Sequence, residues 1–268
     1  MHRCAAGDTV YRGACACLPE RFKSCAAPLR CSIGIFYFSE ACSLNIKAVL
    51  FDLDGTLVNT LEDLAFGVNL VLAGHGFPTH PTDAFKFFAG NGIPVMVRRA
   101  LPEGTDDETG KLITDEFLAY YSKHYADRSY AYDGIVELVG ELKRRGMLTA
   151  VITNKADEVA QVVIEKCCPA DFDMVLGKRE GIPSKPDPTS ARLVMETLGV
   201  SPEECIFVGD TGTDVSTGVN CGAYPVGVLW GFRDESELIK NGAEEIIGKP
   251  VELLGVIDRL NGDEKNEA

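Results

Sequence analysis

The sequence has no long apolar run and is short of basic side chains. No window approaches the roughly 18 continuous apolar residues of a membrane-spanning helix, which argues against a membrane protein. Lysine and arginine together number 26 against 40 aspartates and glutamates, and the formal net charge is −14. Such an acidic chain repels a nucleic-acid backbone, so nucleic-acid binding is not expected. An anionic ligand would need local positive charge from a metal, a lysine or backbone amides.

The sequence also lacks the spacing of a zinc site. The ten cysteines contain no CxxC pair, and the four histidines show no ligand spacing. Many of the cysteines lie early in the chain, at Cys4, Cys15, Cys17, Cys25, Cys31 and Cys42. A disulfide framework, a metal site and a short secretion signal are alternatives for this segment. We favour a disordered or spurious extension over residues 1–45. Because nothing in the remaining chain demands an oxidising compartment, we expect a cytoplasmic protein.

From residue 46 onward, short apolar stretches alternate with helical patterns. The stretches that read as buried strands are 46–52, 147–153, 172–177, 205–210 and 224–230. Amphipathic helix patterns lie between them, over 134–146, 155–168 and 187–199. Strands that alternate with helices are typical of a parallel sheet covered on both faces. We therefore predict an α/β fold in which helices flank a parallel sheet.

A long insertion interrupts the alternation after the first strand. Residues 63–130 read as helices alone, and the sequence TLED at 60–63 has the pattern of a capping box that opens the first helix. We predict a helical cap domain over 63–130. It would cover the carboxyl-terminal edge of the sheet, where open α/β sheets bind ligands. The core domain would then comprise 46–62 and 131–262.

Two acidic motifs follow predicted strands. In DLDGT, Asp52 and Asp54 project to the same side of an extended chain because they are two residues apart. Carboxylates this close destabilise each other unless a cation or a shared proton intervenes. In VGDTGTD, Asp210 and Asp214 again follow a strand, and their oxygens suit a hard divalent cation such as Mg²⁺. Taken singly, each motif could be an ordinary turn or cap.

Two further motifs offer groups that bind anions. Thr153 and Asn154 place a hydroxyl and an amide at a strand end, just before a helix whose N-terminus presents free N–H groups. Lys185, between proline-stiffened neighbours in SKPDP, could offer a fixed cation to a phosphate. An ordinary N-cap and a solvated loop lysine are the alternatives for each motif alone. All four motifs together supply carboxylates for a metal and a nucleophile, and a lysine and a hydroxyl for an oxyanion.

In their order and spacing, these four motifs resemble those of the haloacid dehalogenase-like hydrolase superfamily, in its phosphatase branch. The resemblance covers about residues 46–260. Two less specific stretches, GNGIPVMVRRAL in the cap and GVLWGFRDESELIKNGAEEII near the end, are similar to the phosphoglycolate phosphatase group. The resemblance implies a Rossmann-like core with a helical cap inserted after strand one, Mg²⁺ as cofactor and a small phosphorylated metabolite as substrate.

The resemblance also implies a role for each site residue. Asp52 would be the nucleophile that forms an aspartyl-phosphate, and Asp54 the general acid and then base. Mg²⁺ would be held by the Asp52 carboxylate, the Asp54 backbone carbonyl and Asp210, with Asp214 in support. The phosphoryl oxygens would be bound by Thr153, the Asn154 amide and Lys185. An aspartate at position 54 fits phosphate esters, because the dehalogenase branch carries an aromatic residue there and the phosphonate-cleaving branch an alanine.

Other activities fit the same motifs. A phosphosugar mutase of the β-phosphoglucomutase type uses this core but shields the intermediate from water, and a pyrophosphatase, a nucleotidase or a sugar-phosphate phosphatase is also compatible. A non-catalytic regulator with this fold could have lost any of the acidic residues, so the complete set argues against one. Substrate choice is expected to lie in the cap, and the loop Gly90-Asn91-Gly92 is our first candidate for a leaving-group contact.

Overall fold

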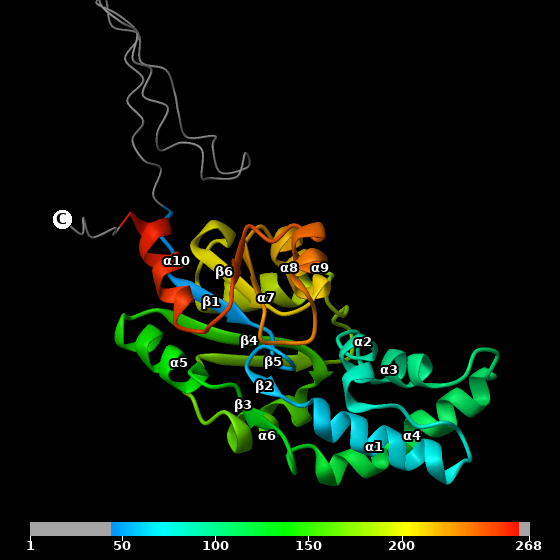
Figure 1. The fold of residues 1–268 in the computed structure, drawn as a ribbon. Coiled ribbons are helices and arrows are strands. Elements are labelled where there is room, and N and C mark those ends of the chain that lie inside the picture. The colour runs from blue at the N-terminus through cyan, green and yellow to red at the C-terminus, as the bar shows by residue number, and fades with distance from the viewer. Residues whose placement is uncertain (1–43, 263–268) are drawn as a thin grey trace, which may run out of the picture.

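The computed structural model describes residues 44–262, which build a six-stranded sheet with helices on both faces (Figure 1). The strand order is β5-β4-β1-β6-β7-β8, and every neighbouring pair is parallel. The strands are β1 (Ala48–Phe51), β4 (Leu148–Ala156), β5 (Met174–Lys178), β6 (Cys205–Gly209), β7 (Tyr224–Val228) and β8 (Glu245–Ile247). The predicted fold class is confirmed.

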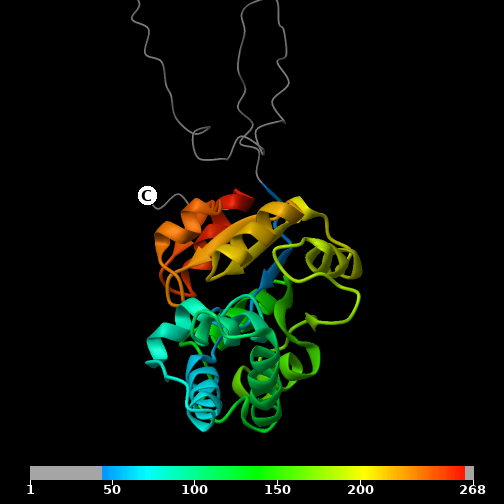
Figure 2. The ribbon, with the colours of Figure 1, turned by 90° about the vertical axis from the view of Figure 1, so that its right-hand side faces the viewer.

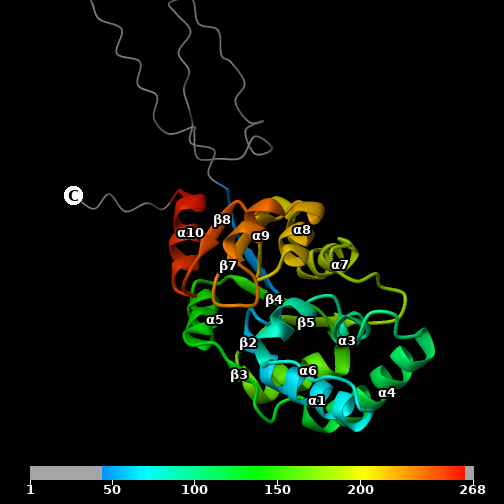
Figure 3. The ribbon, with the colours of Figure 1, turned by 45° about the vertical axis from the view of Figure 1, so that its right-hand side comes forward.

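Each face of the sheet is covered by helices that follow the strands (Figures 1 and 3). One face carries α5 (Ile135–Arg144), α6 (Asp157–Cys167) and α10 (Glu252–Asn261). The other carries α7 (Thr189–Leu198), α8 (Gly212–Cys221) and α9 (Glu235–Lys240). A single 3-10 turn at Pro202–Glu204 leads into β6. Because β1 is central and buried on both sides, its side chains are apolar at every position, as a parallel strand requires.

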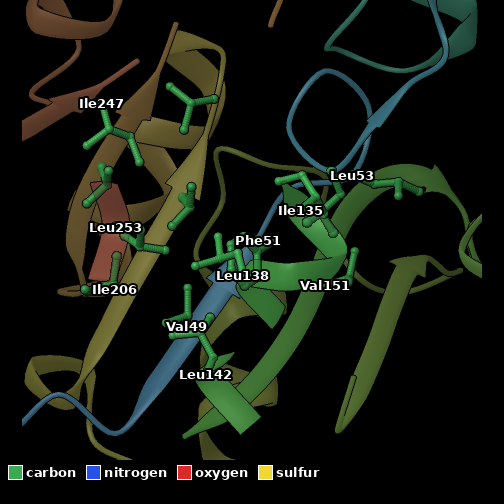
Figure 4. Packing of buried hydrophobic residues seen from close by; sticks show 14 of the residues in the cluster. Val49, Phe51, Leu53, Ile135, Leu138, Leu142, Val151, Ile206, Ile247 and Leu253 are labelled. Carbon is green, nitrogen blue, oxygen red and sulfur yellow. The ribbon is translucent and has the colours of Figure 1, made fainter. Parts of the chain in front are cut away.

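The larger core lies between the sheet and the α5, α6 and α10 face (Figure 4). Val49 and Phe51 of β1 point toward Ile135, Leu138 and Leu142 of α5. The three α5 residues recur at helical spacing, so they share one face of the helix. Residues 48 and 50 of β1 alternate to the opposite face, where they pack against α7 and its neighbours.

The α-helices that lie between β1 and α5 form a cap with a core of its own (Figure 2). They are α1 (Leu61–Gly74), α2 (Phe85–Phe88), α3 (Ile93–Ala100) and α4 (Asp107–His124), with a 3-10 turn at Thr82–Ala84. The cap joins the core through a two-stranded antiparallel ribbon of β2 (Val58–Asn59) and β3 (Tyr130–Ala131). Phe232, from the loop after β7, packs in the hydrophobic cluster of the cap, so the cap and the core contact each other beyond the ribbon.

Some local predictions differ from the structure. Thr60 precedes α1, but its side chain makes no capping bond, and its hydroxyl donates instead to Asp54 at 2.6 Å. The predicted capping box is therefore wrong, because Thr60, its first residue, hydrogen-bonds to the site residue Asp54 instead of to the helix backbone. The ribbon strands and β8 were not predicted, since two or three residues carry no readable alternation.

Three other predictions concern membrane spans, the N-terminal extension and the domain boundaries. No helix in residues 44–262 is long and apolar enough to cross a membrane. The extension predicted over residues 1–45 lies outside the described residues, apart from its last two positions. The exact division of the chain into core and cap stays a prediction.

Candidate active site

Three carboxylates meet at the carboxyl edge of the sheet. Asp52 follows β1, Asp210 follows β6, and Asp214 lies in the first turn of α8. β1 and β6 are parallel neighbours with Phe51 opposite Val208, so their ends bring the first two together. One oxygen from each of the three residues lies within 4.8 Å of the others, and all three residues are buried. The sequence predicted Asp52 and Asp210 as neighbours, and Asp214 joins them in the same cluster.

Each carboxylate is held by specific donors. Asp210 accepts from the Thr56 hydroxyl at 2.9 Å and from the Phe232 backbone N–H at 2.8 Å. Asp214 accepts from both the backbone N–H and the hydroxyl of Thr211, at 3.0 and 2.6 Å. Buried carboxylates with two fixed donors have little freedom to rotate, so their oxygens have a defined direction.

The backbone around Asp210 approaches too closely for any side chain. A Cβ on Gly55 would lie 2.3 Å from an Asp210 oxygen, and Gly55 has a φ of +94°. A Cβ on Gly231 would lie 2.3 Å from the Cβ of Asp210 and 2.4 Å from the Gly55 carbonyl oxygen. Both positions therefore require glycine, because a side chain at either would clash with Asp210. Gly55 also requires it for its positive φ.

Lys185 is the cation inside the cluster. Its Nζ donates to Asp52 at 2.6 Å, to Asp214 at 2.7 Å and to the Ile152 carbonyl at 2.8 Å. Burial by itself would lower the pKa of Lys185, but Asp214 and Asp52 raise it above the usual value. The lysine is thus charged and held by three acceptors of the protein, and its predicted role as a cation for a phosphate stays a prediction.

The charges in this cluster do not balance. The pKa of Asp52 is raised to about 7, chiefly by burial and then by the Asp214 charge, while Lys185 opposes the shift. The pKa of Asp210 is raised well above its usual value by burial and then by Asp214 and Asp52. Three buried carboxylates against one lysine are an excess of negative charge, and oxygen donors of this kind are what a hard divalent cation binds. The residues therefore fit a divalent metal ion, with Asp52 and Asp210 as donors.

A second ion pair lies beside the first. Asp54, the other aspartate of DLDGT, accepts from Lys155 Nζ at 2.8 and 3.0 Å and from the Thr60 hydroxyl at 2.6 Å. The Lys155 side chain is 4% exposed and that of Asp54 18%. Lys155 also lies 5.3 Å from the ring centroid of Tyr121, a residue of α4 in the cap. The side chain of Asp54 is thus held apart from the Asp52 cluster, in contact with a cation of its own.

Sequence reasoning did not assign a role to Lys155. It follows Thr153 and Asn154 directly, so it was taken with the start of the next helix. In the structure β4 continues to Ala156 with an irregular register after Ile152, and this turns Lys155 inward. No sequence signal indicated this role, because the predicted strand ended at residue 153 and Lys155 opened the predicted helix.

The other predicted residues lie around Lys185. Thr153 is buried at the edge of the sheet, and its hydroxyl accepts from the Lys155 backbone N–H at 3.2 Å. The Asn154 side chain holds the Lys185 loop: its Oδ1 accepts from Lys185 N–H at 2.8 Å, and its Nδ2 donates to the Lys185 carbonyl at 3.2 Å. The same Nδ2 lies 3.4 Å from the carbonyl of Gly90 in the cap. The structure therefore brings all predicted site residues together. The Asn154 side chain is already hydrogen-bonded to the backbone of Lys185 and Gly90.

The cap loop selected from the sequence reaches the core. Asn91 donates to the hydroxyl of Thr213, the neighbour of Asp214, at 3.0 Å. Gly90 lies against Thr211, since a Cβ there would be 3.4 Å from the Thr211 methyl group. The loop therefore contacts the same turn that carries Asp214. Its role in binding a leaving group stays a prediction.

Comparison with protein families identifies the family to which the chain belongs. A model of the haloacid dehalogenase-like hydrolases matches residues 49–228. The chain belongs to this family. The superfamily expected from the four motifs is thereby confirmed.

Two relatives and one solved structure to which the chain is similar carry the names of phosphatases. N-acetylmuramic acid 6-phosphate phosphatase of Pseudomonas aeruginosa is 32% identical over 81% of this chain and 96% of the relative. Phosphoglycolate phosphatase 1 of the same species is 37% identical over 80% of each chain. The crystal structure of a predicted phosphoglycolate phosphatase from Haemophilus somnus covers 79% of this chain and 98% of its own, with 26% identity and a TM-score of 0.73. The expected enzyme class, a phosphatase similar to the phosphoglycolate phosphatase group, is confirmed.

Proposed function

We propose that this phosphatase is Mg²⁺-dependent and hydrolyses a small phosphate monoester through a phosphorylated aspartate. The observation that carries the proposal is the separation of the two DLDGT carboxylates. Asp52 lies in the cluster with Lys185, Asp210 and Asp214, while Asp54 contacts Lys155. Two adjacent carboxylates in different surroundings suit two different chemical roles.

Asp52 is the nucleophile in this proposal. One of its oxygens is fixed by Lys185, which leaves the other to attack phosphorus. A divalent cation held by Asp52, the Asp54 carbonyl and Asp210 would keep Asp52 ionised and would reduce its repulsion from the phosphate dianion. The Lys185 ammonium, the Thr153 hydroxyl and the backbone amide of Asn154 would bind the phosphoryl oxygens, where negative charge must be stabilised.

Asp54 moves the proton. It would protonate the leaving alkoxide and then take a proton from the water that hydrolyses the aspartyl-phosphate. Lys155 and Thr60 fix the orientation of its carboxylate, so we assign both as positioning residues. A well-placed general acid is needed here because an alkoxide is a poor leaving group.

The substrate class is a small phosphorylated metabolite, and 2-phosphoglycolate is our first choice. The relatives named phosphoglycolate phosphatase support it. The relative named for N-acetylmuramic acid 6-phosphate supports a sugar phosphate as the second candidate. A phosphosugar mutase would differ from both by requiring a bisphosphate activator.

The test is phosphate release by the full chain in Mg²⁺. The panel would contain 2-phosphoglycolate, N-acetylmuramic acid 6-phosphate, glucose phosphates, pyrophosphate and nucleoside monophosphates, with Asp52→Asn as the blank. We expect turnover of a monoester by the wild type and none by Asp52→Asn, whose circular dichroism spectrum should be unchanged. Full activity in Asp52→Asn would refute the nucleophile assignment.

A further inference from the structure

Arg233 lies where the cap meets the active site. It follows Phe232, whose backbone N–H donates to Asp210 and whose ring packs in the cap cluster. Its guanidinium Nη2 donates to the carbonyl of Ala89 at 3.0 Å, and its Nε lies 3.1 Å from Glu237. The side chain of Arg233 is only 9% exposed. An arginine is thus buried between the metal-site loop and the cap loop.

The third nitrogen of this guanidinium has no acceptor. Nη1 is buried and forms no hydrogen bond with any residue in 44–262. Buried polar groups in folded proteins nearly always have a partner, and an unmade bond to a charged group is costly. By comparison, Lys185 Nζ donates to three acceptors, and Lys155 Nζ contacts both oxygens of Asp54. Arg233 is therefore a cation near the site that keeps a buried nitrogen without an acceptor among the described residues.

The guanidinium of Arg233 lies beside the cap loop that reaches the active site. Gly90 lies between Arg233 and Asn154: a Cβ there would be 3.9 Å from Arg233 Nη2, and its carbonyl is 3.4 Å from Asn154 Nδ2. A phosphoryl group at Asp52 and Lys185 would direct the rest of its ester toward the cap. A short leaving group would then end near the cap loop and Arg233.

We propose that Arg233 is a specificity-determining residue that binds a carboxylate on the leaving group of the substrate. The inference rests on the proposed phosphatase function and narrows its substrate class to phosphate esters of small hydroxy acids. A carboxylate suits the position because a planar guanidinium donates to it with matched geometry.

The competing explanation is that Arg233 only tethers the cap loop. Arg99 provides the matched control, because it donates to the carbonyls of Phe87 and Phe88, at the end of α2 that leads into this loop, at 3.3 and 3.0 Å. Arg99 is exposed, and neither bond leaves a buried donor unpaired. Loss of tethering alone should therefore affect both arginine variants alike.

The experiment compares two substrates that differ in one group. The measured quantity is the ratio of kcat/KM for 2-phosphoglycolate to that for 2-hydroxyethyl phosphate, in which a hydroxymethyl group replaces the carboxylate. We expect Arg233→Met to lower this ratio by about 10- to 100-fold, the usual value of a hydrogen bond to a charged group. Arg99→Met should leave it within about threefold of the wild type. Arg233→Lys keeps the charge and should give a ratio between those of the wild type and Arg233→Met.

The outcomes separate the inference from the function on which it rests. Phosphate release from both substrates with an unchanged ratio in Arg233→Met would overturn the inference and leave the phosphatase proposal standing. An equal fall of the ratio in Arg99→Met would also overturn it in favour of tethering. If Arg233→Met does not fold, an unchanged ratio in Arg233→Lys is the refuting result. If the wild type hydrolyses no monoester, the proposed function fails and the inference fails with it.

Discussion

Replacing Lys155 with methionine tests the second ion pair of the site. Methionine keeps most of the apolar length of the side chain but removes the ammonium that contacts both oxygens of Asp54. Asp54 would retain the Thr60 hydroxyl as a donor, at 2.6 Å, and some access to water, since its side chain is 18% exposed. In the variant, the Asp54 carboxylate therefore loses its counter-charge but keeps one hydrogen-bond donor and some contact with water.

The expected cost follows from this geometry. Removing one partner of a fully buried ion pair costs about 3–5 kcal/mol. The remaining donor and the partial exposure of Asp54 should reduce the loss to about 2–4 kcal/mol in the free energy of unfolding. For a folded region of this size, that corresponds to a fall in Tm of roughly 4–16 °C. Turnover should fall as well, because Asp54 loses the group that orients it.

Urea unfolding at pH 7 of a double-mutant cycle measures the pair directly. The cycle uses Lys155→Met, Asp54→Asn and the double variant, and we expect a coupling energy of about 1–3 kcal/mol. Lys166→Met is the control: Lys166 lies 5.2 Å from the Tyr125 ring, much as Lys155 lies 5.3 Å from Tyr121, but forms no ion pair within residues 44–262. Its loss should change stability by less than about 0.5 kcal/mol. A destabilisation by Lys155→Met that is equally large with Asn at position 54 would refute the reasoning.

Three further predictions concern the metal site, its packing and a surface ion pair. Mg²⁺ should raise the Tm of the wild type, and this shift should be lost in Asp210→Asn; an undiminished shift, followed by differential scanning fluorimetry, would contradict the assignment. Gly231→Ala should destabilise the protein by about 1–3 kcal/mol through its clash with Asp210, whereas Gly255→Ala, with nothing within 4 Å, should be neutral or slightly stabilising in chemical unfolding. The pKa of Glu141 is lowered from 4.5 to about 2, chiefly by Arg144, so its contribution to stability is present above pH 4.5 and is lost as the pH falls through 2. Glu141→Gln should therefore be slightly less stable than the wild type at pH 7. Thermal unfolding should show that this difference in stability becomes smaller in acid and in high salt. A difference that grows in acid would contradict the predicted direction of the pH dependence.

The sequence was most informative where a pattern is long. The buried strands and the helices that follow them repeat their apolar spacing over many residues, so the parallel sheet could be predicted. The position of the site followed from this, because carboxyl ends of parallel strands meet at one edge. Short elements such as β8 and the ribbon depend on pairing with distant residues, which local sequence does not encode. The capping box failed for a related reason, since the Thr60 hydroxyl has a stronger acceptor in Asp54.

Side chains outside the motifs could not be placed in the same way. Lys155 is turned inward by an irregularity in β4, and its orientation depends on Asp54 and Tyr121, which lie far from it in the sequence. Arg233 entered the sequence analysis only as one residue of the stretch GVLWGFRDESELIKNGAEEII, without a role of its own. Its importance depends on burial by the cap and on a missing acceptor, and both are properties of the folded chain.

The two lysines explain how carboxylates only two residues apart can differ in function. Lys185 connects Asp52 to Asp214, so Asp52 belongs to a network whose remaining negative charge calls for a metal ion. Lys155 instead contacts Asp54 alone among the carboxylates described, within hydrogen-bond distance of both oxygens. The two aspartates follow β1 two residues apart, and the lysines from β4 and the loop after β5 give them separate surroundings. A nucleophile and a proton carrier can thus be neighbours in sequence because their counter-charges come from different elements of the fold.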